Sequence, residues 1–308
     1  RPEAELLAVM KHVRFVAMAA EFLRETVGVW PALRSAEAQS MLFNAVLPAV
    51  DGTKPVPRSG FGPRLIYVVG GYSDGEDALT VVELYDPQNS SWRQLASMRG
   101  ARSCHSCVAL DGKLYAVGGI DIGCEPLDTA EVYDPQTDGW QPLANMSTDR
   151  AGLGLAAVCG KVYAIGGVGS GSTLDSVEAY DPQLGAWAPV ASTGGTRSHH
   201  ASVVLDGKIY IMGGFEDRSG GSDVLDTVEV YDPQVDSWQR VANMPHGLDG
   251  HAAAAIGGKI YVTSGTLVCV YDPQVDTWMQ PAGKSNFRGH ASAAVGGKLY
   301  VFGGLQGP

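Results

Sequence analysis

The segment Glu131-Val132-Tyr133-Asp134-Pro135-Gln136-Thr137-Asp138-Gly139-Trp140 decides the fold, because its pattern recurs along most of the 308 residues. The tetrapeptide Tyr-Asp-Pro-Gln occurs five times, and a tryptophan follows each tyrosine seven residues later. These pairs are Tyr85–Trp92, Tyr133–Trp140, Tyr180–Trp187, Tyr231–Trp238 and Tyr271–Trp278. Gly-Gly pairs begin at Gly70, Gly118, Gly166, Gly213 and Gly303. A repeat of about 40 to 50 residues indicates an array of similar structural units.

Each unit is predicted to hold four short antiparallel strands, which we name a, b, c and d in chain order. In the second unit they are expected at Ser106–Leu110, Lys113–Gly119, Ala130–Tyr133 and Trp140–Leu143. Asp111-Gly112 is a tight-hairpin signal between a and b, and Asp134-Pro135 fits a type I turn between c and d. Four-stranded sheets stacked around an axis form a β-propeller. We therefore expect an all-β propeller over residues 64–308.

The repeat register predicts a six-bladed propeller that is incomplete at its C-terminal end. The blades are expected near residues 64–98, 99–147, 148–194, 195–245, 246–283 and 284–308, the last being partial. Strand b occurs six times, but the first lacks a strand a before it and the last is followed by neither c nor d. The sequence therefore resembles a truncated array with an exposed sheet edge, which is a liability. The alternative is a five-bladed closure in which Ala291–Val295 joins blade one.

Residues 1–50 differ from the rest, being rich in Ala, Leu, Glu and Met. These are good helix formers, and apolar residues recur three and four positions apart. Helices are therefore expected over Ala4–His12, Ala19–Thr26 and Ala36–Leu47. Residues 51–63 are rich in Gly, Pro, Ser and Thr, which predicts a linker.

The bulk composition argues against nucleic-acid and membrane partners. The net charge of −11 is the opposite of the basic patch that nucleic-acid binding needs. Neither a run of 18 apolar residues nor a signal-peptide pattern occurs. Five cysteines, an odd number, fit a reducing compartment. We expect a cytoplasmic protein, with a cytoskeletal or nuclear location as further possibilities.

Repeated polar residues are interpreted as scaffold rather than as a metal or catalytic site. Carboxylates recur two residues before Tyr, at Glu83, Glu131, Glu178 and Glu229, and arginines recur at Arg102, Arg150 and Arg197. The fifth unit has Leu248 in place of the arginine and Cys269 in place of the glutamate. Loss of both charges together is expected if the two side chains form a buried ion pair. Histidines also share one repeat position, at His105, His200, His251 and His290. Different blades hold them too far apart for one ion.

The remaining motifs favour neither a cofactor nor catalysis. Cys104 and Cys107 form a C-x-x-C on an expected strand, where this spacing places the thiols on opposite faces. The sequence contains no nucleophile elbow, zinc motif or phosphate loop. We therefore expect no metal, no cofactor and no enzymatic activity.

With these motifs in place, residues 64–308 resemble kelch repeats. Val13-Arg14-Phe15 followed by Met18 is similar to the end of a BACK domain, although Val16 stands where that family usually has Pro. This resemblance implies a BTB-BACK-kelch substrate adaptor of a cullin-RING ubiquitin ligase. The cullin would then bind the BTB and BACK regions, and the propeller would bind a protein substrate. The alternatives are a cytoskeletal or scaffolding kelch protein that binds actin, and a kelch-fold enzyme such as a copper oxidase or a sugar-processing enzyme.

Length variation between repeats locates the expected binding surface. It is concentrated between the Gly pair and strand c, where the fourth unit is longest and the fifth is shortest. Loops on one face of such arrays usually bind partners. The candidate contacts are Tyr72, Ser73, Asp74, Cys104, Ile120, Asp121, His199, Phe215, Glu216, Asp217, Arg218 and Arg288. Some relatives bind acidic peptides through arginines at the start of strand a; here those places hold Cys104, Gly152, His199, Gly250 and Gly289, so an acidic motif is disfavoured.

Overall fold

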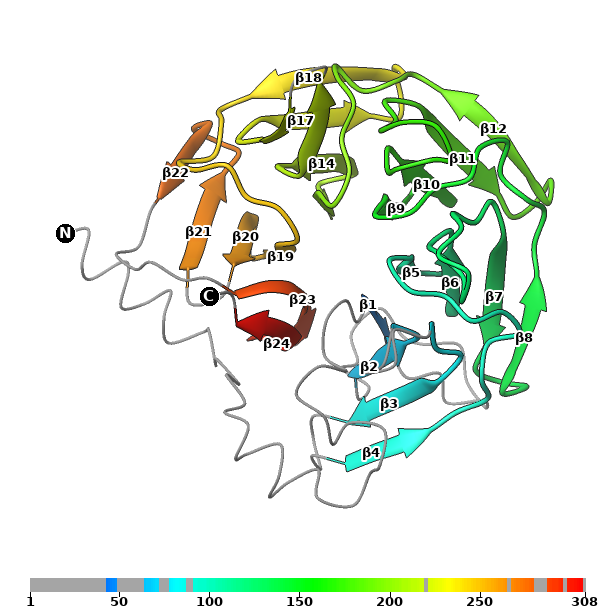
Figure 1. Ribbon diagram of the computed structural model, residues 1–308. Helices are drawn as coiled ribbons and strands as arrows, with labels where there is room; N and C mark the ends of the chain where they lie inside the picture. Colours follow the sequence, from blue (N-terminus) through cyan, green and yellow to red (C-terminus); the bar gives the residue numbers. More distant parts are fainter. Residues whose placement is uncertain are drawn as a thin grey trace.

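The computed structural model describes residues 43–48, 64–71, 78–86, 91–218, 221–264, 267–279, 287–295 and 298–306. These residues form antiparallel sheets arranged around a central axis, with β4, β8, β12, β18 and β22 on the rim (Figure 1). Among them we find no helix, and hence none that could span a membrane.

Five of the sheets have four strands each, in chain order from the axis to the rim. Blade one contains β1 (Phe43–Pro48), β2 (Arg64–Val69), β3 (Val82–Asp86) and β4 (Ser91–Gln94). Blade two contains β5 (Ser106–Leu110), β6 (Lys113–Val117), β7 (Ala130–Asp134) and β8 (Gly139–Pro142). Blade three contains β9 (Gly154–Val158), β10 (Lys161–Ile165), β11 (Val177–Asp181) and β12 (Ala186–Val190). Blade four contains β13 (Ala201–Leu205), β14 (Lys208–Met212), β17 (Val228–Asp232) and β18 (Ser237–Val241). Blade five contains β19 (Ala252–Ile256), β20 (Lys259–Ser264), β21 (Leu267–Asp272) and β22 (Thr277–Met279).

Two further hairpins complete the described part of the fold. β15 (Phe215–Arg218) pairs with β16 (Gly221–Val224) inside the long loop of blade four. β23 (Phe287–Val295) pairs with β24 (Lys298–Gln306) as a two-stranded sheet. β23 lies against β19 and against β1, so this sheet is placed between blade five and blade one.

The predicted blade count is corrected by this topology. The described residues form five four-stranded blades and one two-stranded sheet, not six blades. The alternative closure is also wrong, because Ala291–Val295 pairs with β24 rather than joining blade one. The predicted all-β propeller itself is confirmed.

The predicted third helix, Ala36–Leu47, is wrong over its second half. Residues 43–48 form strand β1, which pairs with β2 so that Phe43 is opposite Val69 and Pro48 is opposite Arg64. Strand β1 therefore supplies the strand a that the repeats lacked, and residues 43–48 belong to the propeller rather than to a separate region. The helices expected over Ala4–His12 and Ala19–Thr26, the BACK-like residues and the linker lie outside the described residues.

In blades two to five, the Tyr-Asp-Pro-Gln and Trp motif joins the blade to the blade before it. In blade two, the rings of Tyr133 and Trp140 have centroids 5.3 Å apart, and Trp140 Nε1 donates to the carbonyl oxygen of Ala96 at 2.9 Å. Asp138 Oδ1 accepts hydrogen bonds from the Tyr133 hydroxyl at 2.7 Å and from the Ala96 amide at 3.0 Å. The indole contact recurs in blades three to five, at Trp187, Trp238 and Trp278.

The predicted Arg–Glu pairs are confirmed within blades two, three and four. Arg150 Nη2 lies 2.9 Å from Glu178 Oε1, and both side chains are buried. Arg150 also donates to the carbonyl oxygens of Gly166 and Ser176, so the guanidinium fixes the loop that follows the glycine pair. The other pairs are Arg102–Glu131 and Arg197–Glu229. These residues are scaffold, and they hold the loops on one end of the ring.

Candidate partner-binding face

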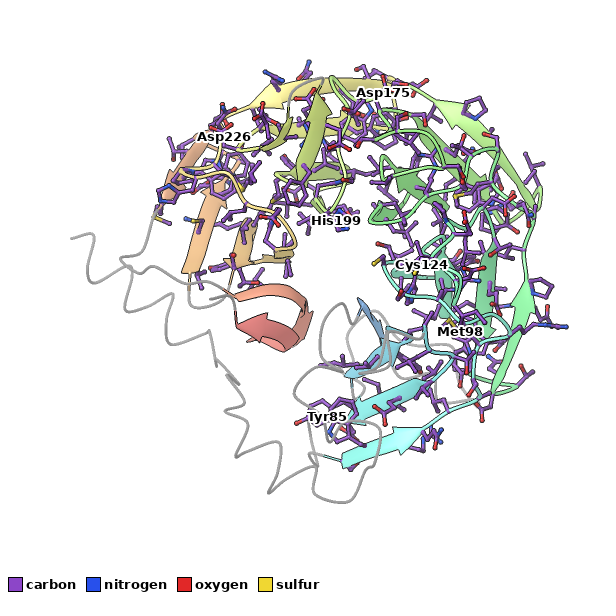
Figure 2. All side chains as sticks on the ribbon, viewed as in Figure 1. Tyr85, Met98, Cys124, Asp175, His199 and Asp226 are labelled. Atoms are coloured by element: carbon purple, nitrogen blue, oxygen red, sulfur yellow. The ribbon has the colours of Figure 1, made fainter. Side chains whose placement is uncertain are left out.

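The b–c and d–a loops of blades two to four emerge together at one end of the propeller. They comprise residues 118–129, 143–153, 166–176, 191–200, 213–227 and 242–251, of which 219–220 are not described. We refer to these six segments as the loop face. In Figure 2, His199 and Cys124 lie toward the inside of the ring, whereas Asp175 and Asp226 lie nearer its rim.

Backbone hydrogen bonds connect the d–a loops of successive blades. The amide of Gly152 donates to Cys104 O at 2.8 Å, the amide of His199 donates to Gly152 O at 2.7 Å, and the amide of Gly250 donates to His199 O at 3.0 Å. All four residues have left-handed backbones, with φ between 51° and 58°. Such a backbone is uncommon for residues other than glycine, so Cys104 and His199 are held there by this series of bonds. The sequence placed these residues at one repeat position, and the structure connects them.

His199 and Phe215 are brought together, as the prediction of a shared site requires. Their ring centroids are 6.1 Å apart, with the ring planes at 78°. His199 Nδ1 lies 3.3 Å from Ser198 Oγ, and a Cβ placed on Gly152 would be 2.9 Å from the imidazole. Burial lowers the pKa of His199, and nearby Asp249 acts in the opposite direction. The imidazole is therefore neutral at pH 7 and packs as an aromatic surface.

Cys104 has the chemistry of a buried thiol. Burial raises its pKa, a hydrogen bond with Ser103 lowers it, and the nearby Cys124 raises it. The thiolate is the nucleophile and the metal ligand, so a thiol with a raised pKa is suited to neither role. Within the described residues, no group of three or more His, Cys, Asp or Glu side chains could hold a metal ion.

Ile120 and Asp121 shape the loop of blade two. Ile120 forms bridges to Ser103 and Pro126. Asp121 Oδ1 accepts hydrogen bonds from the amides of Gly123 at 2.7 Å and Glu125 at 3.1 Å, which closes the loop. Between these contacts, the Ile122 side chain is 68% exposed. Ile122 is not among the contacts predicted from the sequence, although an aliphatic residue at the tip of a polar loop is a signal that identifies it.

The b–c loop of blade four contains a hairpin, whereas the b–c loop of blade five is very short. Glu216 and Asp217 lie on β15, and Thr173 Oγ1 of blade three donates to Asp217 Oδ2 at 3.0 Å. In blade five, Ser264 is paired directly with Leu267, so only two residues connect β20 to β21. The predicted long and clipped loops are therefore confirmed, and the contact from Thr173 fixes the hairpin against its neighbour.

Five further predicted contacts remain, and the structure describes two of them. Tyr72, Ser73 and Asp74 lie outside the described residues. Arg288 lies on β23, where it is paired with Leu305. Arg218 is the last residue of β15 and is paired with Gly221.

Acidic side chains dominate the loop face. They are Asp121, Glu125, Asp128, Asp149, Asp175, Glu216, Asp217, Asp223, Asp226 and Asp249. The same segments contain no lysine and three arginines. Two of these, Arg150 and Arg197, are buried against glutamates of strand c. The face is therefore an anionic surface that carries a few aromatic and aliphatic groups.

Comparisons of the chain with protein-family models and with solved structures agree with this architecture. The family model described as the KLHDC2/KLHL20/DRC7 kelch-repeats domain matches residues 43–214. The model described as the FKB95 kelch-repeats domain matches residues 146–307. Among the solved structures that match, the one titled "Structure of YjhT" has a TM-score of 0.69 and 17% sequence identity, and the match covers 88% of this chain and 93% of that chain. At this identity the likeness shows the fold alone. Each family model covers more than half of the 308 residues, and the chain belongs to the kelch-repeat family.

Proposed function

We propose that this chain is a protein-binding propeller that holds its partner on the loop face. The observation that carries the proposal is the contrast between repeated scaffold and varied loops. The Tyr, Trp, Arg and Glu contacts recur from blade to blade, whereas the b–c loop contains the hairpin of β15 and β16 in blade four and is only a two-residue connection in blade five. Such a raised edge beside a low one gives an uneven surface that a partner can fit.

The charge of the face supports a cationic partner segment. The loop face has ten carboxylates and three arginines, and two of these arginines are already buried in ion pairs. Complementary charge steers association and rejects partners of like charge. Ile122 and Phe215 add apolar contacts, so the preferred ligand combines Lys or Arg with an aliphatic or aromatic side chain. A cationic ligand also agrees with the sequence at the start of strand a, where none of the blades has the arginine with which some relatives bind acidic peptides.

As a wider role, we propose substrate recognition for a cullin-RING ubiquitin ligase, in the cytoplasm or nucleus. The support is the resemblance of residues 13–18 to a BACK domain, together with the kelch array. Attachment to actin filaments is the competing role. That the chain is not an enzyme stays a prediction.

Affinity capture with the 308-residue chain tests the protein-binding proposal and the ubiquitin-ligase role separately. The expected outcome is recovery of a protein whose contact segment is basic, with less recovery at high salt. Loss of cullin activity should then raise the level of that protein in cells. An unchanged level would contradict the ligase role alone, whereas capture that does not depend on the loop face would contradict the binding proposal.

A further inference from the structure

Four Asp-Gly dipeptides lie in the described part of the chain. They are Asp111-Gly112, Asp138-Gly139, Asp206-Gly207 and Asp249-Gly250, whereas Asp51-Gly52 and Asp74-Gly75 lie outside the described residues. In this dipeptide the aspartate Cγ is open to attack by the next backbone nitrogen, because glycine has no Cβ to obstruct it. The four dipeptides therefore share one reactive arrangement, and their surroundings decide which of them can react.

Two of these dipeptides form exposed hairpin turns. Asp111-Gly112 and Asp206-Gly207 connect strands a and b in blades two and four, with no other residue between the paired ends of the strands. The aspartates have φ of 49° and 50°, and both glycines have φ of 75°. Positive φ at both central residues is the mark of a type I′ turn. Both aspartates are exposed to solvent.

This turn already holds aspartate in the backbone conformation that favours ring closure. In a succinimide the glycine nitrogen is bonded to the aspartate Cγ, and the five-membered ring keeps the aspartate ψ near −120°, roughly that of the first central residue of a type II′ turn. Types I′ and II′ share a φ of about 60° at this residue, and both connect two-residue hairpins. Rotation of the peptide group between Asp and Gly therefore interconverts the two turns while the strands stay in place.

The carboxyl group of Asp138 is held in contacts that oppose this reaction. Its Oδ1 accepts hydrogen bonds from the Ala96 amide at 3.0 Å and from the Tyr133 hydroxyl at 2.7 Å. The bond from Ala96, followed by the bond from Tyr133, lowers the pKa of Asp138. Ring closure expels water from the protonated carboxyl group, so two hydrogen bonds to the ionised form disfavour it.

In Asp249-Gly250 it is the attacking nitrogen that is engaged. The Gly250 amide donates to His199 O at 3.0 Å, within the series of bonds that connects the d–a loops. Ring closure at Asp249 would remove this proton and break the bond between blades. Both residues are also partly buried, unlike Asp111 and Asp206.

We propose that Asp111 and Asp206 are sites of spontaneous isomerisation to isoaspartate, whereas Asp138 and Asp249 are protected in the folded chain. The glycine nitrogen attacks Cγ, the N–Cγ bond forms, and the carboxyl hydroxyl leaves as water with the amide proton. Water then adds to the main-chain carbonyl carbon of the aspartate and breaks its bond to nitrogen. Since one water leaves and one returns, the mass is unchanged and no other reactant is needed.

The product changes the turn but does not involve the loop face. Isoaspartate adds one carbon atom to the main chain, so a two-residue turn between strands a and b becomes longer than the hairpin requires. These turns lie at the end of the blades opposite the loop face, because the strands are antiparallel and the b–c loops leave from the other end. The modification therefore does not depend on the proposed partner binding.

Peptide mapping of the whole chain after incubation in mildly acidic buffer tests the proposal. A protease that cleaves before aspartate but not before isoaspartate locates the product at each site. The isomerised fraction should be at least about fivefold higher at Asp111 and Asp206 than at Asp138, where two hydrogen bonds oppose the reaction. It should also be higher than at Asp249. In urea the four sites should react at similar rates. Equal fractions at all four sites in the folded chain, or the same ranking in urea, would overturn the proposal.

Two variants provide matched controls. Blade five has Gly257-Gly258 at the same turn, with φ of 57° and 76°, so Asp206→Gly keeps the turn and removes the carboxyl group. It should abolish the product at residue 206 and leave that at Asp111. Tyr133→Phe removes one hydrogen bond to Asp138 and should raise isomerisation there by about twofold or more. An unchanged fraction at Asp138 in this variant, shown to be folded by circular dichroism, would contradict the protection described.

Discussion

Arg102 Nη2 lies 3.0 Å from Glu131 Oε1, with both side chains almost fully buried, and neither residue contributes to the loop face directly. Glu131 also accepts hydrogen bonds from the amides of Arg99 and Gly100, each at 2.9 Å. One ion pair therefore fixes both a b–c loop and a d–a loop. The equivalent pairs in blades three and four position the loops around His199 in the same way, so the scaffold of the repeat shapes the candidate site.

The ion pairs predict a non-additive mutant series in blade three. Arg150→Leu should destabilise the chain by about 3–5 kcal/mol, because Glu178 is left as a buried, uncompensated charge. The double variant Arg150→Leu/Glu178→Cys reproduces the Leu248 and Cys269 combination of blade five and should recover a large part of that loss. Urea unfolding of the two variants measures the difference. A double variant that is less stable than Arg150→Leu would show that the pair is not coupled as described.

Blade three also lacks a contact that blades two, four and five have. Asp138, Asp236 and Asp276 accept from a tyrosine hydroxyl and a backbone amide, but the equivalent residue after Tyr180 is Gly185. A Cβ on Gly185 would meet no atom within 4 Å, and its φ of 65° resembles the 45–50° of the three aspartates. Gly185→Asp should therefore stabilise the chain by about 0.5–1.5 kcal/mol, the net value of a hydrogen bond. Thermal unfolding measures it. Gly185→Ala, which has no acceptor, should destabilise the chain.

Buried histidine predicts a loss of stability in mild acid. Burial lowers the pKa of His200 well below its ordinary value of 6.5, with Arg197, His251 and His199 acting in the same direction. As pH falls below 6.5, the unfolded chain binds a proton that the folded chain does not. The free energy of unfolding should then fall by about 1.4 kcal/mol per pH unit for this residue until the folded pKa is reached.

The equivalent position in blade three holds Leu153, which makes His200→Leu a natural control. This variant should flatten the dependence of the unfolding free energy between pH 7 and pH 5.5. An unchanged slope would show that His200 is protonated equally in both states.

The sequence predicts those parts of the molecule that repeat. Tyr133, Trp140 and the buried Arg–Glu pairs recur in fixed order, so their roles could be inferred without coordinates. Strand β1 could not, because Phe43–Pro48 follows an Ala-rich segment and becomes a strand only by pairing with β2. Strand formation depends on neighbours that are distant in sequence. The bonds that join Cys104, Gly152, His199 and Gly250, and the exposure of Ile122, likewise depend on contacts between blades or within a single loop.

The charge of the loop face predicts a directional effect on partner affinity. Asp223 is exposed on β16, so Asp223→Lys should weaken a cationic partner without loss of a buried contact. The matched control is Gln136→Lys/Gln183→Lys, which changes the net charge by the same amount at exposed positions in the c–d turns. Charges at the edge of a binding interface act mainly on the association rate and on the salt dependence of the affinity.

The most direct measurement is the dissociation constant of the captured partner for these two variants and for the unaltered chain at low and at high salt. Binding at the loop face predicts an affinity at least about fivefold lower for Asp223→Lys at low salt, a smaller difference at high salt because charges are screened, and no effect of the control. Equal affinities for all three chains, or weakening by the control alone, would contradict binding at the loop face.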